Sequence, residues 1–168
     1  KGGESETVLG AWFAQGGKRA RVKLATKIGA PPDNVKIDAK SIVAACEGSL
    51  ARLKTDYIDL YQVHFDDKVS APEEFMGALD GLVKAGKVRV LGSSNMSAAR
   101  LVEANAVAAK NGFARFDTMQ PQYNLMRREI EADLLPACVA EGISVLTYFS
   151  LAAGYLTGKY RTEADLSK

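Results

Sequence analysis

The feature that most constrains the fold is a regular alternation of helical and extended segments. After an opening helix, apolar extended segments follow one another with a helical segment between each pair, at a spacing of roughly 30 residues, the length of a βα unit. Alternation of this kind predicts a parallel sheet with right-handed crossovers. Two closures are possible: a (β/α)8 TIM barrel and an open, doubly wound sheet. Five βα units are too few for a complete barrel, which typically needs about 250 residues.

Apolar periodicity and turn residues define the individual segments. Residues 38–54, for example, place Ile42, Cys46, Leu50 and Leu53 at helical spacing. We expect Pro136 to kink or interrupt the last helix. The predicted helices cover residues 4–15, 38–54, 71–85, 97–111 and 128–141, and the predicted strands cover residues 21–28, 57–65, 88–92, 116–124 and 143–151.

Length and composition indicate one globular domain that spans residues 1–168. The apolar content of 47% is enough for a core, and the net charge of +2 comes from acidic and basic residues mixed along the chain. This balance favours neither nucleic acid nor a membrane surface as a partner. The first residues lack a hydrophobic signal region, and no apolar run is long enough to span a bilayer, so we expect a cytoplasmic protein.

The cysteines and the histidine do not form a recognisable metal site. Cys46 and Cys138 lie far apart, and His64 is the one histidine of the chain. This set cannot build a zinc site of the usual kind, so we expect no metal. No Gly-x-Gly-x-x-Gly motif follows a predicted strand, which leaves a Rossmann dinucleotide site without support.

Polar or aromatic residues fall at the carboxyl ends of the predicted strands, where parallel α/β folds bind their ligands. Each has a plain structural alternative: a solvated lysine, a satisfied core histidine, a helix N-cap, or a residue that completes the backbone hydrogen bonding. Their repetition on successive strands is typical of a (β/α) enzyme site. The residues are Lys27, His64, Ser94 with Asn95, Gln120 and Tyr148.

Several longer segments resemble the aldo-keto reductase family, in family order over nearly the whole chain. Residues 49–64 read Ser-Leu-Ala-Arg-Leu-Lys-Thr-Asp-Tyr-Ile-Asp-Leu-Tyr-Gln-Val-His, and residues 120–125 read Gln-Pro-Gln-Tyr-Asn-Leu. Further matches lie at residues 3–10, 25–27, 78–89, 91–95 and 156–161. The resemblance implies an NADPH-binding (β/α)8 barrel, of which this chain covers the third to seventh strands.

The resemblance also implies an activity, the reduction of an aldehyde or ketone to an alcohol by hydride from NADPH. In such enzymes a tyrosine protonates the carbonyl oxygen. Lys27 matches the lysine that lowers the pKa of that tyrosine, since a nearby cation favours the phenolate. His64 matches the histidine that orients the carbonyl and assists proton delivery.

The remaining matches concern the cofactor. Ser94, Asn95 and Gln120 match groups that hydrogen-bond the nicotinamide carboxamide, and Tyr148 matches the aromatic residue that stacks on the ring. The loop that wraps the pyrophosphate corresponds to Phe149, Ser150, Leu151, Gly154 and Lys159.

The sequence departs from the family pattern in three respects. The family's aspartate and acid tyrosine precede the matched stretch, and none of the six tyrosines of this chain matches the acid. Phe65 and Asp66 stand where many members have Trp-Pro. Residues 148–151 read Tyr-Phe-Ser-Leu, whereas many members read Tyr-Ser-Pro-Leu.

Two further functions remain open beside a carbonyl reductase. One is a non-enzymatic NADPH-binding module that resembles the potassium-channel β subunits, and the other is an inactive truncated barrel. The channel subunits tend to lack the histidine that this chain has at position 64, which favours the enzyme.

Overall fold

The computed structural model describes residues 3–29, 36–162 and 164–165. Its centre is a sheet in which all neighbouring strands are parallel and follow the order β1-β2-β3-β4-β5. The strands are β1 (Ala25–Ile28), β2 (Ile58–Val63), β3 (Val88–Ser94), β4 (Phe116–Gln120) and β5 (Ser144–Val145). The α-helices are α1 (Glu4–Phe13), α2 (Ala39–Leu53), α3 (Pro72–Lys84), α4 (Ala98–Asn111) and α5 (Leu134–Ala140). The 3₁₀ helices are η1 (Arg19–Arg21), η2 (Glu129–Glu131) and η3 (Ala152–Thr157).

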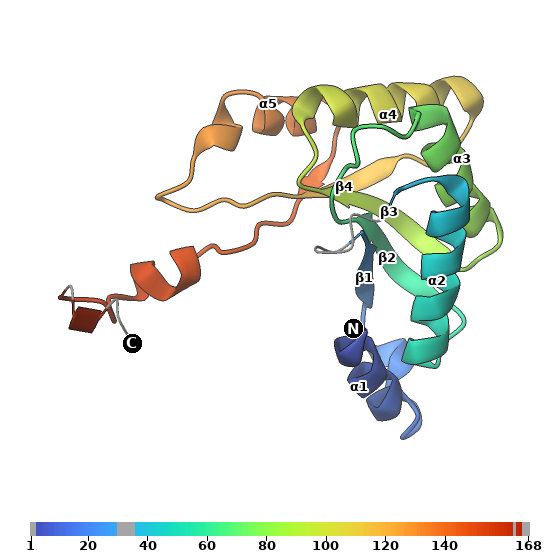
Figure 1. Cartoon of the computed structure of the whole chain (residues 1–168), viewed down its shortest axis with the longest axis horizontal. Helices are drawn as coiled ribbons and strands as arrows, with labels where there is room; N and C mark the ends of the chain where they lie inside the picture. Colours follow the sequence, from blue (N-terminus) through green and yellow to red (C-terminus); the bar gives the residue numbers. More distant parts are fainter. Residues whose placement is uncertain (1–2, 30–35, 163, 166–168) are drawn as a thin grey trace.

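The strand order decides between the two closures that the sequence allows. In a doubly wound sheet the order reverses at a switch point, whereas here it simply follows the chain. Helices α2, α3 and α4 accordingly lie along one side of the sheet (Figure 1). This is the arrangement of part of a (β/α) barrel, as predicted.

The hydrophobic core lies between the sheet and these helices. Side chains alternate along a strand, so one set of each strand faces the helices. In β4 a register shift between Phe116 and Thr118 brings both Phe116 and Met119 into the core. The buried core includes Tyr61, Val63, Leu91, Phe116 and Met119 from the strands and Ile42, Cys46, Phe75, Met76, Leu79, Leu101 and Ala104 from the helices. The other set faces away from the helices, and the register aligns Lys27 with Gln62, Gln62 with Gly92, and Gly92 with Thr118.

Two helices begin and end close to where the sequence predicts. The Asp38 carboxylate accepts the Ser41 N–H at the start of α2, and the Ser97 hydroxyl accepts the Arg100 N–H at the start of α4. Gly112 ends α4 in the left-handed conformation (φ 66°) that favours glycine.

The predicted strand at residues 21–28 is wrong in its first half. Residues Arg19–Arg21 form η1, because the Arg19 guanidinium turns inward to the Asp59 carboxylate and the Tyr57 carbonyl, both at 2.8 Å. Asp59 also accepts the Leu24 N–H at 3.0 Å. Side-chain partners thus hold this segment, and the strand begins only at Ala25.

The predicted helix at residues 128–141 is also wrong in part. It is divided into η2 and α5, and the break falls at Ala132 and Asp133, not at Pro136. Pro136 is the third residue of α5, where a backbone N–H has no partner within the helix, so proline is tolerated there.

The predicted strand at residues 143–151 is shorter than expected, with Ser144–Val145 as its regular part. Leu146 N–H donates to the Met119 carbonyl, and Tyr148 N–H donates to the Pro121 carbonyl. In a regular parallel pair, a third hydrogen bond would lie between these two and would be donated by the N–H of residue 121. Residue 121 is a proline and has no N–H. Tyr148 is therefore held beside β4 by an isolated bridge to Gln122.

Candidate active site

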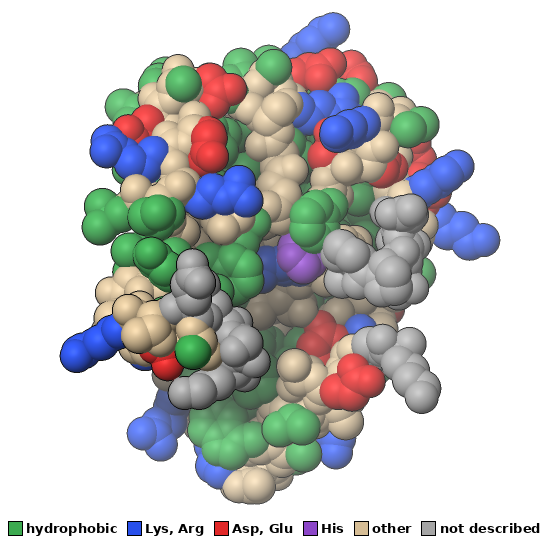
Figure 2. Space-filling model, turned by 60° about the vertical axis from the view of Figure 1, so that its left-hand side comes forward, with side chains coloured by type: hydrophobic (Ala, Val, Ile, Leu, Met, Phe, Trp, Pro, Cys, Tyr) green, Lys and Arg blue, Asp and Glu red, His purple; other side chains and the backbone are tan. Residues whose placement is uncertain are grey.

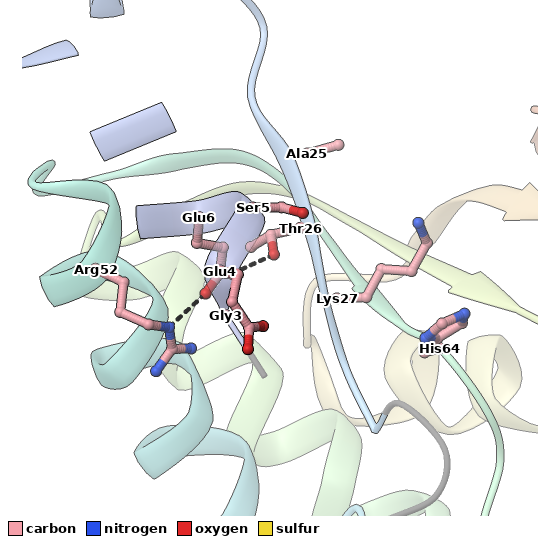
Figure 3. Close-up of a pocket in the computed structure, with 9 residues that line it drawn as sticks. All are labelled: Gly3, Glu4, Ser5, Glu6, Ala25, Thr26, Lys27, Arg52 and His64. Carbon is pink, nitrogen blue, oxygen red and sulfur yellow. Dashed lines mark hydrogen bonds and ion pairs between the residues drawn. The ribbon is translucent and has the colours of Figure 1, made fainter. Parts of the chain in front are cut away.

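Lys27 and His64 come together at the carboxyl ends of two adjacent strands. Lys27 lies in β1, and His64 directly follows β2 with its N–H bonded to the Ile28 carbonyl at 2.8 Å. Both line a pocket of about 440 Å³ with residues 3–6, Ala25, Thr26 and Arg52. Figure 3 shows the Lys27 and His64 side chains on the same side of β1. The histidine lies in a hollow of the surface (Figure 2).

The surroundings of His64 favour the neutral imidazole. Partial burial and the nearby Lys27 ammonium lower the pKa of His64 below its usual value. The Phe65 ring lies beside the imidazole, with 4.6 Å between the ring centroids. A neutral imidazole carries one N–H, so His64 can donate a hydrogen bond to a carbonyl oxygen at neutral pH.

Glu6 lies in the same pocket but is held in place by other residues. Its carboxylate accepts hydrogen bonds from the Thr26 hydroxyl and from the Arg52 guanidinium, the latter at 2.7 Å. Burial opposes ionisation of Glu6, but the hydrogen bonds from Thr26, Arg52 and Ser49 together bring its pKa below the usual value. Glu6 therefore joins α1 to β1 and α2 as an ionised group and is a poor candidate for the proton donor.

A row of hydrogen bonds connects the ends of β2, β3, β4 and β5. The Ser94 hydroxyl donates to the Gln120 carbonyl at 2.7 Å. The Asn95 amide nitrogen donates to the His64 carbonyl at 3.1 Å and to the Ser94 hydroxyl at 3.0 Å. The Tyr148 hydroxyl donates to the Asn95 side-chain oxygen at 2.8 Å. The predicted residues at these four strand ends thus form one network.

The network leaves different hydrogen-bonding capacity on each of its members. Both amide protons of Asn95 and the hydroxyl proton of Ser94 have acceptors within the network, so these side chains can offer only remaining lone pairs. The Gln120 side-chain amide bonds to none of the residues that the structure describes. Among Ser94, Asn95 and Gln120, the side chain of Gln120 is therefore the one with N–H donors to spare.

The last five predicted site residues lie on the segment after β5. Phe149 follows Tyr148 directly, and the Ser150 and Thr147 hydroxyls are 2.9 Å apart. Gly154 adopts a φ of 93° with the Lys159 side chain close above it, so that a Cβ there would lie 2.9 Å from Nζ. Figure 1 shows the end of this segment extending away from the sheet. Tyr148 is linked to His64 by hydrogen bonds through Asn95. Leu151, Gly154 and Lys159 have no such link among the described residues.

Two polar residues that the sequence analysis passed over face the same side of the sheet. Gln62 is 1% exposed, and its amide nitrogen has no partner among the described residues. The Thr118 hydroxyl is likewise buried without one. Gln62 precedes His64 by two positions, so strand alternation could have placed both on one face.

A singly wound parallel sheet whose strand order follows the chain defines the chain as part of a (β/α) barrel. The sequence profile of the aldo/keto reductase family matches residues 1–168, and the chain belongs to this family. The relative YrpG is named as an oxidoreductase and the relative YhdN as an aldo-keto reductase.

Three relatives illustrate the similarity. The oxidoreductase YrpG of Bacillus subtilis is 40% identical over 94% of this chain and 51% of its own length. Aldo-keto reductase YhdN of the same organism is 41% identical over 96% of this chain and 48% of its own. Norsolorinic acid reductase of Aspergillus flavus is 35% identical over the full chain and 45% of its own length. The chain thus spans about half the length of the relatives that it matches.

None of the helices in the described ranges is both long and apolar enough to cross a membrane.

Proposed function

We propose that the chain supplies the nicotinamide-binding part of an NADPH-dependent reductase of aldehydes or ketones. The observation that carries the proposal is the Lys27–His64 pair, which lies beside a hydrogen-bonded row of polar strand ends. The name of one relative, norsolorinic acid reductase, agrees with reductive chemistry.

The available groups fit a reduced nicotinamide. The Gln120 amide is free to bind the carboxamide, and the Asn95 side-chain oxygen keeps a lone pair. Tyr148, fixed by its hydroxyl, presents an aromatic face for the ring. Backbone N–H groups of residues 149–151 and the Lys159 ammonium suit a pyrophosphate, whereas the Ala152 and Gly154 N–H groups already donate to the Phe149 and Leu151 carbonyls. When bound, the cofactor supplies the hydride.

His64 and Lys27 act on the carbonyl oxygen in this proposal. The neutral imidazole donates a hydrogen bond that polarises and orients the carbonyl group. The Lys27 ammonium stabilises negative charge that develops nearby, and it would lower the pKa of an adjacent tyrosine. No tyrosine is among the described residues that line the pocket. We therefore assign the proton donor to the family tyrosine that precedes the matched stretch.

The test separates cofactor binding from turnover. NADPH and reduced nicotinamide mononucleotide are titrated into the protein while the fluorescence of the reduced ring is followed. NADPH consumption is then measured with an aromatic aldehyde. We expect both compounds to bind, and we expect His64→Gln to abolish consumption while cofactor affinity changes little. The control is Lys23→Met, because the Lys23 side chain is 87% exposed.

Either of two results would count against the proposal. If neither compound binds, the nicotinamide site is refuted. If NADPH binds and no carbonyl compound is reduced, the protein is better described as a cofactor-binding module of the kind that the sequence leaves open.

A further inference from the structure

Asn124 links the loop after β4 to the segment after β5. The residue is 7% exposed, and its side-chain amide nitrogen donates to the Phe149 carbonyl at 3.0 Å. Its side-chain oxygen accepts the Met126 N–H at 2.8 Å, which closes a local turn. Backbone bonds between Asn124 and Arg127 complete that turn. Asn124 therefore holds Phe149 from a small, ordered turn.

The bond to Phe149 matters because of the conformation of Phe149. This residue has a φ of 53°, in the left-handed region that bulky side chains adopt only at a cost in free energy. The residue is 59% exposed, and its ring meets that of Tyr148 edge-on, with 5.3 Å between the centroids. The Phe149 carbonyl accepts two hydrogen bonds that can offset this cost, from the Ala152 N–H at 2.7 Å and from the Asn124 amide at 3.0 Å. The Ala152 bond lies within the segment after β5, so Asn124 supplies the one of the two that ties the turn to the loop after β4.

Tyr148 lies between two attachments. Its hydroxyl is bonded to Asn95 at one end, and its backbone is bonded to Pro121 and Tyr123 at the other. The peptide that follows Tyr148 turns sharply at Phe149, where Asn124 binds. Without Asn124, the Phe149 carbonyl keeps only the Ala152 N–H of these two donors, and the turn loses its link to the loop after β4. We expect the turn to shift and the Tyr148 ring to shift with it.

We propose that Asn124 is a positioning residue that fixes the Tyr148–Phe149 turn, and through it the ring of Tyr148 against which the nicotinamide stacks. The inference deepens the proposed function and rests on it for the role of Tyr148. Asn124 itself contacts neither of the candidate catalytic residues. Its effect passes through the backbone of residues 148 and 149.

The neighbouring residue Tyr123 provides a matched control. Its hydroxyl donates to Glu131 at 2.6 Å, and Arg128 binds the same carboxylate through two nitrogens at 2.8 Å each. These contacts stabilise the same loop but do not involve Phe149. Tyr123→Phe therefore tests loop stability alone, whereas Asn124→Asp keeps an acceptor for Met126 and removes the donor to Phe149.

The first measurement needs no cofactor. Nuclear magnetic resonance signals of the Asn95 side-chain amide report its hydrogen bonds and the neighbouring Tyr148 ring. We expect Asn124→Asp and Asn124→Ala to shift these signals and Tyr123→Phe to leave them in place. Unchanged Asn95 signals in both Asn124 variants would overturn the inference, whatever the cofactor results.

The second measurement is the affinity for reduced nicotinamide mononucleotide, together with the induced circular dichroism of the bound ring. Loss of one buried hydrogen bond predicts about tenfold weaker binding and a smaller dichroism signal in both Asn124 variants. Equal weakening in Tyr123→Phe would show that only loop stability matters and would overturn the inference. If the unmodified protein binds no nucleotide, the proposed function fails, and the Asn95 signals still decide whether Asn124 positions Tyr148.

Discussion

His64 offers a direct measurement of the site's electrostatics at the scale of single residues. Because it is the one histidine of the chain, its ring resonances can be assigned without ambiguity. Burial and the Lys27 ammonium both lower its pKa below the ordinary 6.5. We expect a titration midpoint below 6.5, and we expect Lys27→Met to move it upward, since only burial then remains. A midpoint that does not respond to Lys27→Met would show that the two side chains are not coupled.

The lowered pKa of His64 also determines how the stability of the fold changes with pH. In the unfolded chain His64 binds a proton near pH 6.5, whereas in the folded chain it does so only at lower pH. On acidification the unfolded state therefore binds a proton at His64 before the folded state does. The free energy of unfolding accordingly falls as the pH drops below 6.5. His64→Gln should flatten this part of the profile of unfolding temperature against pH.

Gln120 is the residue for which hydrogen-bond accounting makes the sharpest prediction about the cofactor. Its amide retains free donors, whereas the donors of Ser94 and Asn95 are used within the network. Gln120→Ala should weaken binding of reduced nicotinamide mononucleotide about tenfold, as expected for one hydrogen bond. Ser94→Ala should act differently, by loosening the β3–β4 contact and lowering the unfolding temperature. Calorimetric titration and thermal unfolding of both variants distinguish these roles, and equal affinity of Gln120→Ala and the unmodified protein would refute the assignment.

At this scale the sequence could predict which residues lie near the strand ends, but not which of their hydrogen-bonding groups are already used. Lys27 and His64 could be placed at one rim because parallel strands end on the same side. The hydrogen bonds of Asn95 to His64 and Tyr148 could not be predicted, since they depend on contacts between segments that are distant in the sequence. For Asn124 the sequence indicates only that an asparagine suits a local turn, and it gives no sign of the bond to Phe149.

At the scale of elements, two helical glycines predict opposite results for the same substitution. A Cβ on Gly10 would lie 2.1 Å from the Arg52 carbonyl oxygen, so alanine there must push α1 away from α2. Gly81 in α3 has no such neighbour within 4 Å. We expect Gly10→Ala to destabilise by about 1–3 kcal/mol, as overpacking does, and Gly81→Ala to stabilise by about 0.5–1 kcal/mol. Chemical denaturation measures both, and similar effects of the two changes would contradict the close α1–α2 contact.

Elements were predictable where their ends are encoded locally. Asp38, Ser97 and Gly112 mark helix ends through their own side chains or backbone preferences, and those helices were placed within a residue or two. A strand was wrongly predicted for residues 21–24 because Asp59, distant in the sequence, binds Arg19 and the Leu24 N–H there. The predicted length of the last strand was too great because Pro121, in the segment beside it, has no N–H to donate to the hydrogen bonds between the two segments.

At the scale of the whole molecule, the sheet is open at β1. The carbonyls of Leu24 and Ile28 accept bonds from Leu60 in β2 and from His64 directly after it. Because backbone groups alternate sides along a strand, the N–H groups of Ala25 and Lys27 point toward the other edge. No strand in the described ranges pairs with that edge. It lies beside the pocket that contains Lys27 and His64.

An open edge of this kind predicts self-association of the 168-residue chain when it is prepared by itself. Unpaired strand edges recruit further strands, and proline at an edge position prevents this because it has no N–H to donate. Ala25→Pro should therefore reduce association while leaving the bonds of β1 to β2 intact, since the Ala25 N–H points away from β2. Sedimentation velocity across a concentration series measures the association, and far-ultraviolet circular dichroism checks that Ala25→Pro keeps the fold. Monomeric behaviour of the unmodified chain throughout that series would show that the edge of β1 is protected. Association that persists unchanged in Ala25→Pro would place the contact on another surface, such as the exposed apolar side chains Leu146, Phe149 and Leu151.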